Sequence, residues 1–145
     1  MKISSHAFKD GTAIPDQYTQ CGENKIPPLY LEDVPERARS LALVMEDPDA
    51  SQGTFNHWVL FNIDPKIREI KEDSVPVMAT QGCNDFGEVH YDGPNPPTGE
   101  HRYCFRLFAL DTVLPLPRGI RRAELDRELE GHIIDSAALV GTYAL

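Results

Sequence analysis

The sequence predicts a single, mainly β domain, a β-sandwich with one helix late in the chain. Twelve prolines and ten glycines are scattered through it and separate short apolar runs, which is typical of strands joined by ordered loops. The length of 145 residues fits one domain with its own core, so we expect one unit over residues 1–145. Only the segment from 121 to 138 has a helical period.

Three apolar runs predict strands, and a fourth is a weaker candidate. They lie at residues 39–46, 57–63 and 101–110, with the weaker one at 75–78. The first two are almost continuously apolar, which predicts strands covered on both faces. By strand alternation, His57 shares the face of Val59 and Phe61.

The strand predicted at 101–110 begins with a histidine that follows a loop stiffened by three prolines. Alternation places His101 and Tyr103 on the face that also carries Phe105, and it turns Arg102 and Arg106 to the opposite face. Polar residues at the rim of an apolar face are either hydrogen-bonded core residues or the polar groups of a pocket.

The segment from 121 to 138 is predicted to be a helix, because Leu125, Leu129 and Ile133 recur four residues apart. Gly131 lies inside this segment and costs about 1 kcal/mol relative to alanine in a helix. We therefore expect a close contact or a break near His132. Residues 139–143 are a candidate for a short final strand.

Net charge and cysteine content exclude some classes of partner and indicate the cellular compartment. Nucleic-acid binding normally requires a basic surface, and the formal net charge of this chain is −9, so no nucleic-acid partner is expected. Cys21, Cys83 and Cys104 show no paired spacing, which predicts free thiols in a reducing cytoplasm. Neither a signal-like start nor a run of 18 apolar residues is present, which predicts a cytoplasmic protein with no membrane insertion.

Polar side chains stand at three predicted strand ends. Asp47 follows the first strand, His57 begins the second, and His101 with Tyr103 begins the third. Pro48 holds Asp47 in an extended conformation at its strand exit. An isolated Asp-Pro-Asp is also what an Asx turn requires, so Asp47 alone does not define a site.

Three chemistries use an aspartate and two histidines. Hydrolysis requires an oriented nucleophile, yet Cys104 alternates away from His101 and no nucleophile-elbow motif exists. A metal site uses the same residue types, but Asp47, His57 and His101 come from distant segments and show none of the short sequence spacings typical of metal ligands. Anion binding requires only imidazole and tyrosine donors with backbone N–H groups from the loop 93–99, and Asp47 favours a protonated imidazole. We therefore expect no catalytic residue, metal or cofactor.

Short motifs follow one another along the chain: Asp47-Pro48-Asp49-Ala50, His57-Trp58-Val59, Asn84-Asp85-Phe86-Gly87, the segment Tyr91 to Tyr103, and Gly131-His132 with Leu139-Val140-Gly141-Thr142-Tyr143. The pair formed by Asp47-Pro48-Asp49-Ala50 and the segment from Gly93 to Tyr103 is specific. In their order and spacing, these motifs resemble the phosphatidylethanolamine-binding protein family, and more closely its compact bacterial and archaeal branch, related to the Raf kinase inhibitor proteins. The resemblance covers essentially the whole chain.

The resemblance implies an antiparallel Greek-key β-sandwich, with a C-terminal helix packed at one side and a small pocket for phosphate or phosphoryl groups. It implies binding without catalysis, modulation of kinases, proteases or signalling partners, and a homodimer. Matched position by position, the pocket residues are Asp47, His57, Pro96, Pro97, His101 and Tyr103, with Phe55 at the mouth.

Two functional hypotheses follow, with a third that is weaker. The favoured one is a non-enzymatic module whose pocket binds a phosphorylated small molecule or protein group and modulates a kinase or other signalling partner. The second is a serine protease inhibitor that acts through a surface loop, and the third is a hydrolase or metal enzyme at the Asp/His cluster. Because no arginine is assigned to the pocket, affinity of about micromolar or weaker is expected.

Overall fold

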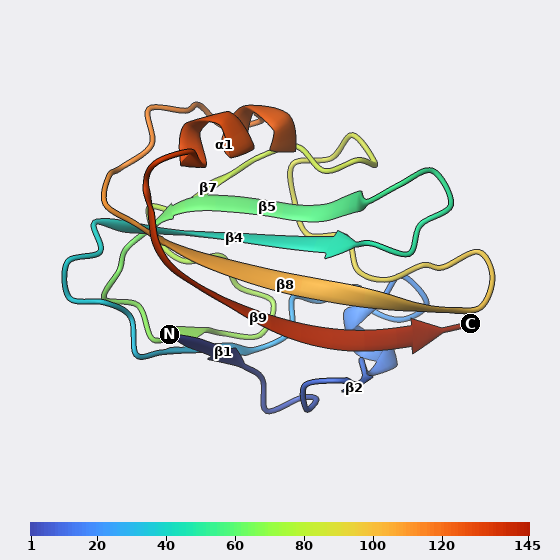
Figure 1. Cartoon of the computed structure of the whole chain (residues 1–145). Helices are drawn as coiled ribbons and strands as arrows, with labels where there is room; N and C mark the ends of the chain where they lie inside the picture. Colours follow the sequence, from blue (N-terminus) through green and yellow to red (C-terminus); the bar gives the residue numbers. More distant parts are fainter.

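The computed structural model describes residues 1–145 as two β-sheets with one short α-helix. A six-stranded sheet has the order β2-β9-β8-β4-β5-β7, and a three-stranded sheet has the order β1-β3-β6 (Figure 1). The elements are β1 (Lys2–Ser4), β2 (Thr12–Ala13), the 3-10 helix η1 (Asp16–Tyr18), β3 (Leu29–Glu32), β4 (Ser40–Asp47), β5 (Phe55–Ile63), β6 (Glu69–Ile70), β7 (Thr80–Gln81), β8 (Glu100–Leu110), α1 (Arg122–Leu129) and β9 (Ile133–Ala144).

The large sheet has a Greek-key order. Strands β4, β5 and β7 lie side by side, and β8 returns to pair with the free side of β4, which gives the order 8-4-5-7. Every strand pair is antiparallel except β2 with β9. The predicted mainly β architecture with a helix late in the chain is therefore confirmed.

Strand β4 is buried along its whole length, as its continuous apolar sequence predicts. Leu41, Leu43 and Met45 face the small sheet and belong to the larger core cluster. Ala42 and Val44 face the other way and pack in a smaller cluster with Leu125 and Leu129 of α1, among others. The two clusters lie on opposite faces of β4, so each face of β4 has its own cover.

The helix predicted over 121–138 is wrong in its second half. The helix α1 ends at Leu129, and Gly131 adopts a φ of +78°, a left-handed conformation that ends a helix and favours glycine. The break expected near His132 is thus present. Residues 133–138 instead belong to β9, where pairing with β8 over eleven positions outweighs the local helical spacing, and Ile133 is exposed.

The weaker strand candidate at 75–78 is also wrong, because these residues form a loop and a turn. Pro76 has no N–H for a strand ladder, and Met78 has a φ of +71°. The paired strand β7 begins two residues later, at Thr80. The three main strands occur where the sequence predicts them, each shifted by two residues or fewer. No helix of the structure is long and apolar enough to cross a membrane.

Candidate functional site

One end of the large sheet carries a cavity of about 250 Å³. Strand β4 ends there, whereas β5 and β8 begin there, because both are antiparallel to β4 (Figure 1). All seven residues predicted for the pocket line it, and their role in binding stays a prediction. The lining is Asp47, Ala50, Ser51, Gln52, Phe55, His57, Phe86, Asn95, Pro96, Pro97, His101 and Tyr103.

Asp47 holds the turn after β4 and also orients His101. One carboxylate oxygen, Oδ1, accepts the backbone N–H of Asp49 at 2.8 Å, which is the Asx turn that the sequence allowed. The other, Oδ2, lies 2.6 Å from Nδ1 of His101. A carboxylate accepts hydrogen bonds only, so Nδ1 carries the hydrogen and Nε2 is left for the cavity. Asp47 therefore makes the turn contact and the histidine contact at the same time.

Asp49 fastens the same turn to the outer side of β8. Its carboxylate accepts two bonds from the Arg102 guanidinium, at 2.8 and 3.0 Å, and one from the Arg102 backbone N–H at 2.9 Å. These hydrogen bonds lower the pKa of Asp49 to about 2. The bidentate pair ties β8 to the turn beside Asp47, and it uses an arginine that points away from the cavity.

A β-bulge turns His57 into the cavity. Met45 pairs with Trp58, but its neighbour Glu46 pairs with Asn56, so β5 has one extra residue, His57, at this point. Simple alternation predicted that His57 would share the face of Val59 and Phe61, which pack toward α1, and that prediction is wrong. The bulge shifts the alternation by one residue and brings His57 to the side of Asp47, His101 and Tyr103.

The imidazole of His57 is buried among aromatic rings. It meets the rings of Phe55, Phe86 and Tyr103 edge-on, with each pair of centroids 5.3 Å apart. Its Nδ1 lies 2.7 Å from the backbone oxygen of Asp92. Burial lowers the pKa of His57, and the contact with Asp92 only partly opposes this shift. Near neutral pH the ring is therefore uncharged.

The hydroxyl of Tyr103 is the only buried side-chain nitrogen or oxygen atom that has no hydrogen-bond partner. The residue is fully buried, and burial together with the negative charge of Asp47 raises the pKa of its hydroxyl. The backbone of Asn95 comes near enough to oppose this rise in pKa, but it makes no hydrogen bond to the hydroxyl. The group is therefore a neutral donor at physiological pH. A buried hydroxyl without a partner costs about 1–3 kcal/mol, so a native structure that retains one calls for an explanation such as a bound ligand.

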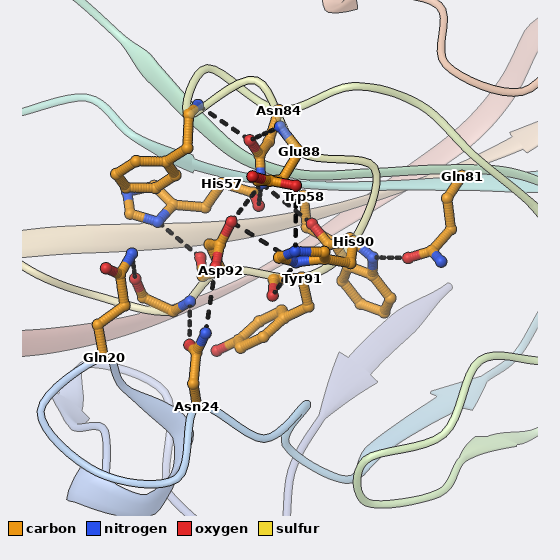
Figure 2. Close-up of polar contacts among 12 residues, drawn as sticks. Gln20, Asn24, His57, Trp58, Gln81, Asn84, Glu88, His90, Tyr91 and Asp92 are labelled. Atoms are coloured by element: carbon orange, nitrogen blue, oxygen red, sulfur yellow. Dashed lines mark hydrogen bonds and ion pairs between the residues drawn. The ribbon is translucent and has the colours of Figure 1, made fainter.

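A second layer of polar residues fixes the loop behind His57 (Figure 2). Asp92 is buried, and its carboxylate accepts bonds from Asn84 at 2.8 Å and from Asn24 at 3.1 Å. Asn84 is fully buried and also donates to the backbone oxygens of His90 and His57. Because the carbonyl of Asp92 holds His57, this network sets the position of the imidazole.

Sequence reasoning missed this network and part of the cavity wall. Asn84 and Phe86 belong to the turn motif Asn84-Asp85-Phe86-Gly87, in which Oδ1 of Asn84 accepts the backbone N–H of Phe86 at 2.9 Å. That turn motif was the signal that could have identified both residues. A second cavity, of about 290 Å³, contains none of the predicted residues and is lined partly by Asn24, His90 and Tyr91.

The cavity offers hydrogen-bonding groups, two imidazoles among them, but neither arginine nor lysine lines it. Cys104 lies on the opposite face of β8, where burial raises the pKa of its thiol. No group of three or more His, Cys, Asp or Glu side chains is arranged to hold a metal ion. The arrangement therefore suits a small polar ligand held by imidazoles, a hydroxyl and loop backbone.

These features define a class of protein, a two-sheet β fold with a small polar cavity where the large sheet ends. The family model described as phosphatidylethanolamine-binding protein matches residues 4–144. The chain belongs to this family.

Similar proteins of nearly the same length extend the match. A UPF0098 protein of Methanothermobacter thermautotrophicus is 45% identical over 99% of this chain and 98% of its own length. A UPF0098 protein of Aquifex aeolicus is 44% identical over 99% of this chain and 88% of its own. The crystal structure of a putative phosphatidylethanolamine-binding protein homologue from Chlamydia trachomatis superposes with a TM-score of 0.95 at 39% identity, covering 99% and 97% of the two chains. E. coli YbcL gives a TM-score of 0.92 at 29% identity, covering 99% and 98%.

Proposed function

We propose that this protein is a non-enzymatic binding module whose cavity takes phosphate or a phosphoryl group. The observation that carries the proposal is the unpartnered hydroxyl of Tyr103, buried against a cavity that His57 and His101 also line. An oxyanion would accept from this hydroxyl and relieve its cost. Asp47 adds to the fit, because its contact with Nδ1 of His101 orients that ring and leaves Nε2 for a ligand.

The expected binding is weak. A phosphate site of high affinity normally uses a bidentate arginine, and the cavity has none. We therefore expect a dissociation constant of about 1 μM or higher. Weak binding suits a protein that responds to the concentration of a phosphorylated small molecule or to a phosphorylated group on another protein. We further propose, from family membership, that occupancy modulates a kinase or other signalling partner.

A titration followed by NMR tests the binding. Phosphate and O-phosphorylethanolamine are added near pH 6 while histidine and backbone signals are observed. Shifts confined to residues of the cavity are expected in the wild type, and they should be lost in His101→Ala. The matched control is His132→Ala, because Nδ1 of His132 also contacts an aspartate, Asp111 at 2.7 Å, but lies outside the cavity. Unchanged binding in His101→Ala would refute the proposal.

Protease inhibition through a surface loop is the second candidate. The observation that favours it is the exposed turn with Val77 and Met78, whose exposed fractions are 80% and 86%. Inhibition of trypsin- or chymotrypsin-like enzymes that persists in His101→Ala and is lost in Met78→Asp would support this candidate. The proposed homodimer is tested separately, by sedimentation equilibrium.

A further inference from the structure

The tautomer of His57 is fixed by the backbone. A carbonyl oxygen can only accept, so the 2.7 Å contact with the oxygen of Asp92 requires that Nδ1 carries the hydrogen. The carbonyl itself is held in place, because the neighbouring N–H of Gly93 donates to Asn24 at 2.7 Å and the Asp92 carboxylate is bound by Asn84 and Asn24. In the neutral ring, Nε2 is therefore an acceptor with no partner in the protein.

The surroundings keep this ring neutral. Asp47 from β4 and Asp92 from the loop favour a charged imidazole, but burial opposes them and lowers the pKa of His57. From β8, the groups nearby are His101 and Tyr103, and Tyr103 is neutral. The remaining neighbours, Phe55 and Phe86, offer no hydrogen bond.

The cavity thus offers one donor and one acceptor beside His101. Tyr103 donates and Nε2 of His57 accepts, while the contact of His101 Nδ1 with Asp47 leaves Nε2 of that ring for a ligand. A fully deprotonated oxyanion would place its lone pairs against the lone pair of His57. An oxyanion that carries one proton can donate it to Nε2 of His57 and accept from Tyr103.

We propose that the cavity selects oxyanions that carry a proton, such as the monoanion of a phosphomonoester, and that His57 is the residue that imposes this selection. The inference rests on the proposed function and specifies its ligand. Phosphodiesters and sulfate carry no such proton near neutral pH, and are expected to bind more weakly. A phosphomonoester has its second pKa at about 6, so its affinity should fall as the pH rises above this value.

The test compares phosphate with sulfate, which has the same shape and no proton. Both are titrated into the wild type at pH 6 and constant ionic strength, with the ¹⁵N signals of histidine as the readout. We expect sulfate to bind at least about tenfold more weakly, the effect of one charged hydrogen bond. O-phosphorylethanolamine and glycerophosphorylethanolamine make the same comparison between a monoester and a diester.

Two variants separate selection from affinity. His57→Gln replaces a fixed acceptor with an amide that both donates and accepts, so sulfate should then bind within about twofold of phosphate. Tyr103→Phe removes a donor that serves either anion, so both should weaken while their ratio is kept. Far-UV circular dichroism checks that each variant is folded. The ratio of phosphate affinity to sulfate affinity in the wild type tests the inference independently of both variants.

Two results would overturn the inference. One is sulfate binding as tight as phosphate binding in the wild type, and the other is conversion of the His57 ¹⁵N signals to those of an imidazolium when phosphate binds. Either leaves the proposed oxyanion-binding function in place. Absence of binding by both anions would overturn that function and this inference together.

Discussion

Asn84→Ala should weaken both the fold and the cavity, because this one side chain connects the loop 84–92 to β5. The amide is fully buried. Nδ2 lies within hydrogen-bond distance of the Asp92 carboxylate and of the backbone oxygens of His90 and His57, and its two hydrogens are shared among these three acceptors. Oδ1 accepts from the backbone N–H groups of Phe86 and Glu88 (Figure 2). Alanine removes all five contacts and leaves the loop held by Asn24, by the bonds between Asp85 and Asn56, and by the Tyr91 hydroxyl, which donates to the backbone oxygen of Tyr18.

The cost can be worked out contact by contact. The bond to the buried Asp92 carboxylate is worth about 1.5–3 kcal/mol, as hydrogen bonds to charged groups are. The four backbone partners lose about 1 kcal/mol each at most, and those of Phe86 and Glu88 are near solvent and recover much of it from water. The expected loss in the free energy of unfolding is therefore about 3–5 kcal/mol, a large part of the 5–15 kcal/mol of a typical domain.

Urea denaturation measures this loss. With a slope of about 2 kcal/mol/M, the midpoint should fall by roughly 1.5–2.5 M. Phosphate affinity should fall as well, because the carbonyl of Asp92 no longer holds His57. The control is Asn62→Ala, which removes an amide that bonds both backbone groups of Leu114, at 2.8 and 2.9 Å, away from the cavity. It should lower stability and leave affinity unchanged. A loss below about 1 kcal/mol in Asn84→Ala, or equal affinity in both variants, would refute the reasoning.

Three further outcomes are expected. Tyr103→Phe should keep the free energy of unfolding within about 1 kcal/mol of wild type or raise it, because the lost hydroxyl has no hydrogen-bond partner. A sharp fall in the urea midpoint would contradict this expectation. Gly93→Ala should destabilise the fold more than Gly99→Ala, because the added Cβ at position 93 would lie 2.1 Å from the backbone oxygen of Tyr18. A Cβ at position 99 would have no neighbour within 4 Å and would add only the strain of a φ of +70°, worth about 1–2 kcal/mol. Equal urea midpoints in the two variants would count against the clash. The stabilisation from Asp49 should be present above the unfolded pKa of about 3.9. It should be lost as the pH falls to its folded pKa of about 2. In Arg102→Ala the pKa of the Asp49 carboxyl should rise toward the unfolded value without reaching it, because the side-chain bonds are lost and the backbone N–H bond remains; carboxyl ¹³C NMR reports this pKa directly.

The main strands and the residues of the cavity could be predicted because each has a local signal. Continuous apolar runs indicate β4 and β5, and alternation in β8 correctly places Tyr103 with Phe105 and turns Arg102 outward. The strands of the small sheet have two to four residues, too few for a period to be visible. The start of β9 is set by pairing with β8, a tertiary effect that competes with the spacing of Leu125, Leu129 and Ile133.

The polar network was hidden for a different reason. Asn84 and Asp92 are in loops, where a polar residue is normally assigned to the surface, yet both are buried. Their burial depends on partners distant in sequence, such as Asn24, whose amide reaches Asp92 across 68 positions. Nothing within a few residues of Asn84 or Asp92 indicates those partners.

The extra residue at His57 makes the site depend on the length of a strand as well as on its composition. Deleting Asn56 would restore regular alternation and turn His57 toward α1, even with every residue of the cavity still in the sequence. Among related chains, identity at the positions of Asp47, His57 and His101 is then a poor guide to a working cavity by itself. The pairing register between β4 and β5 separates a chain that has the cavity from one that has only its residues.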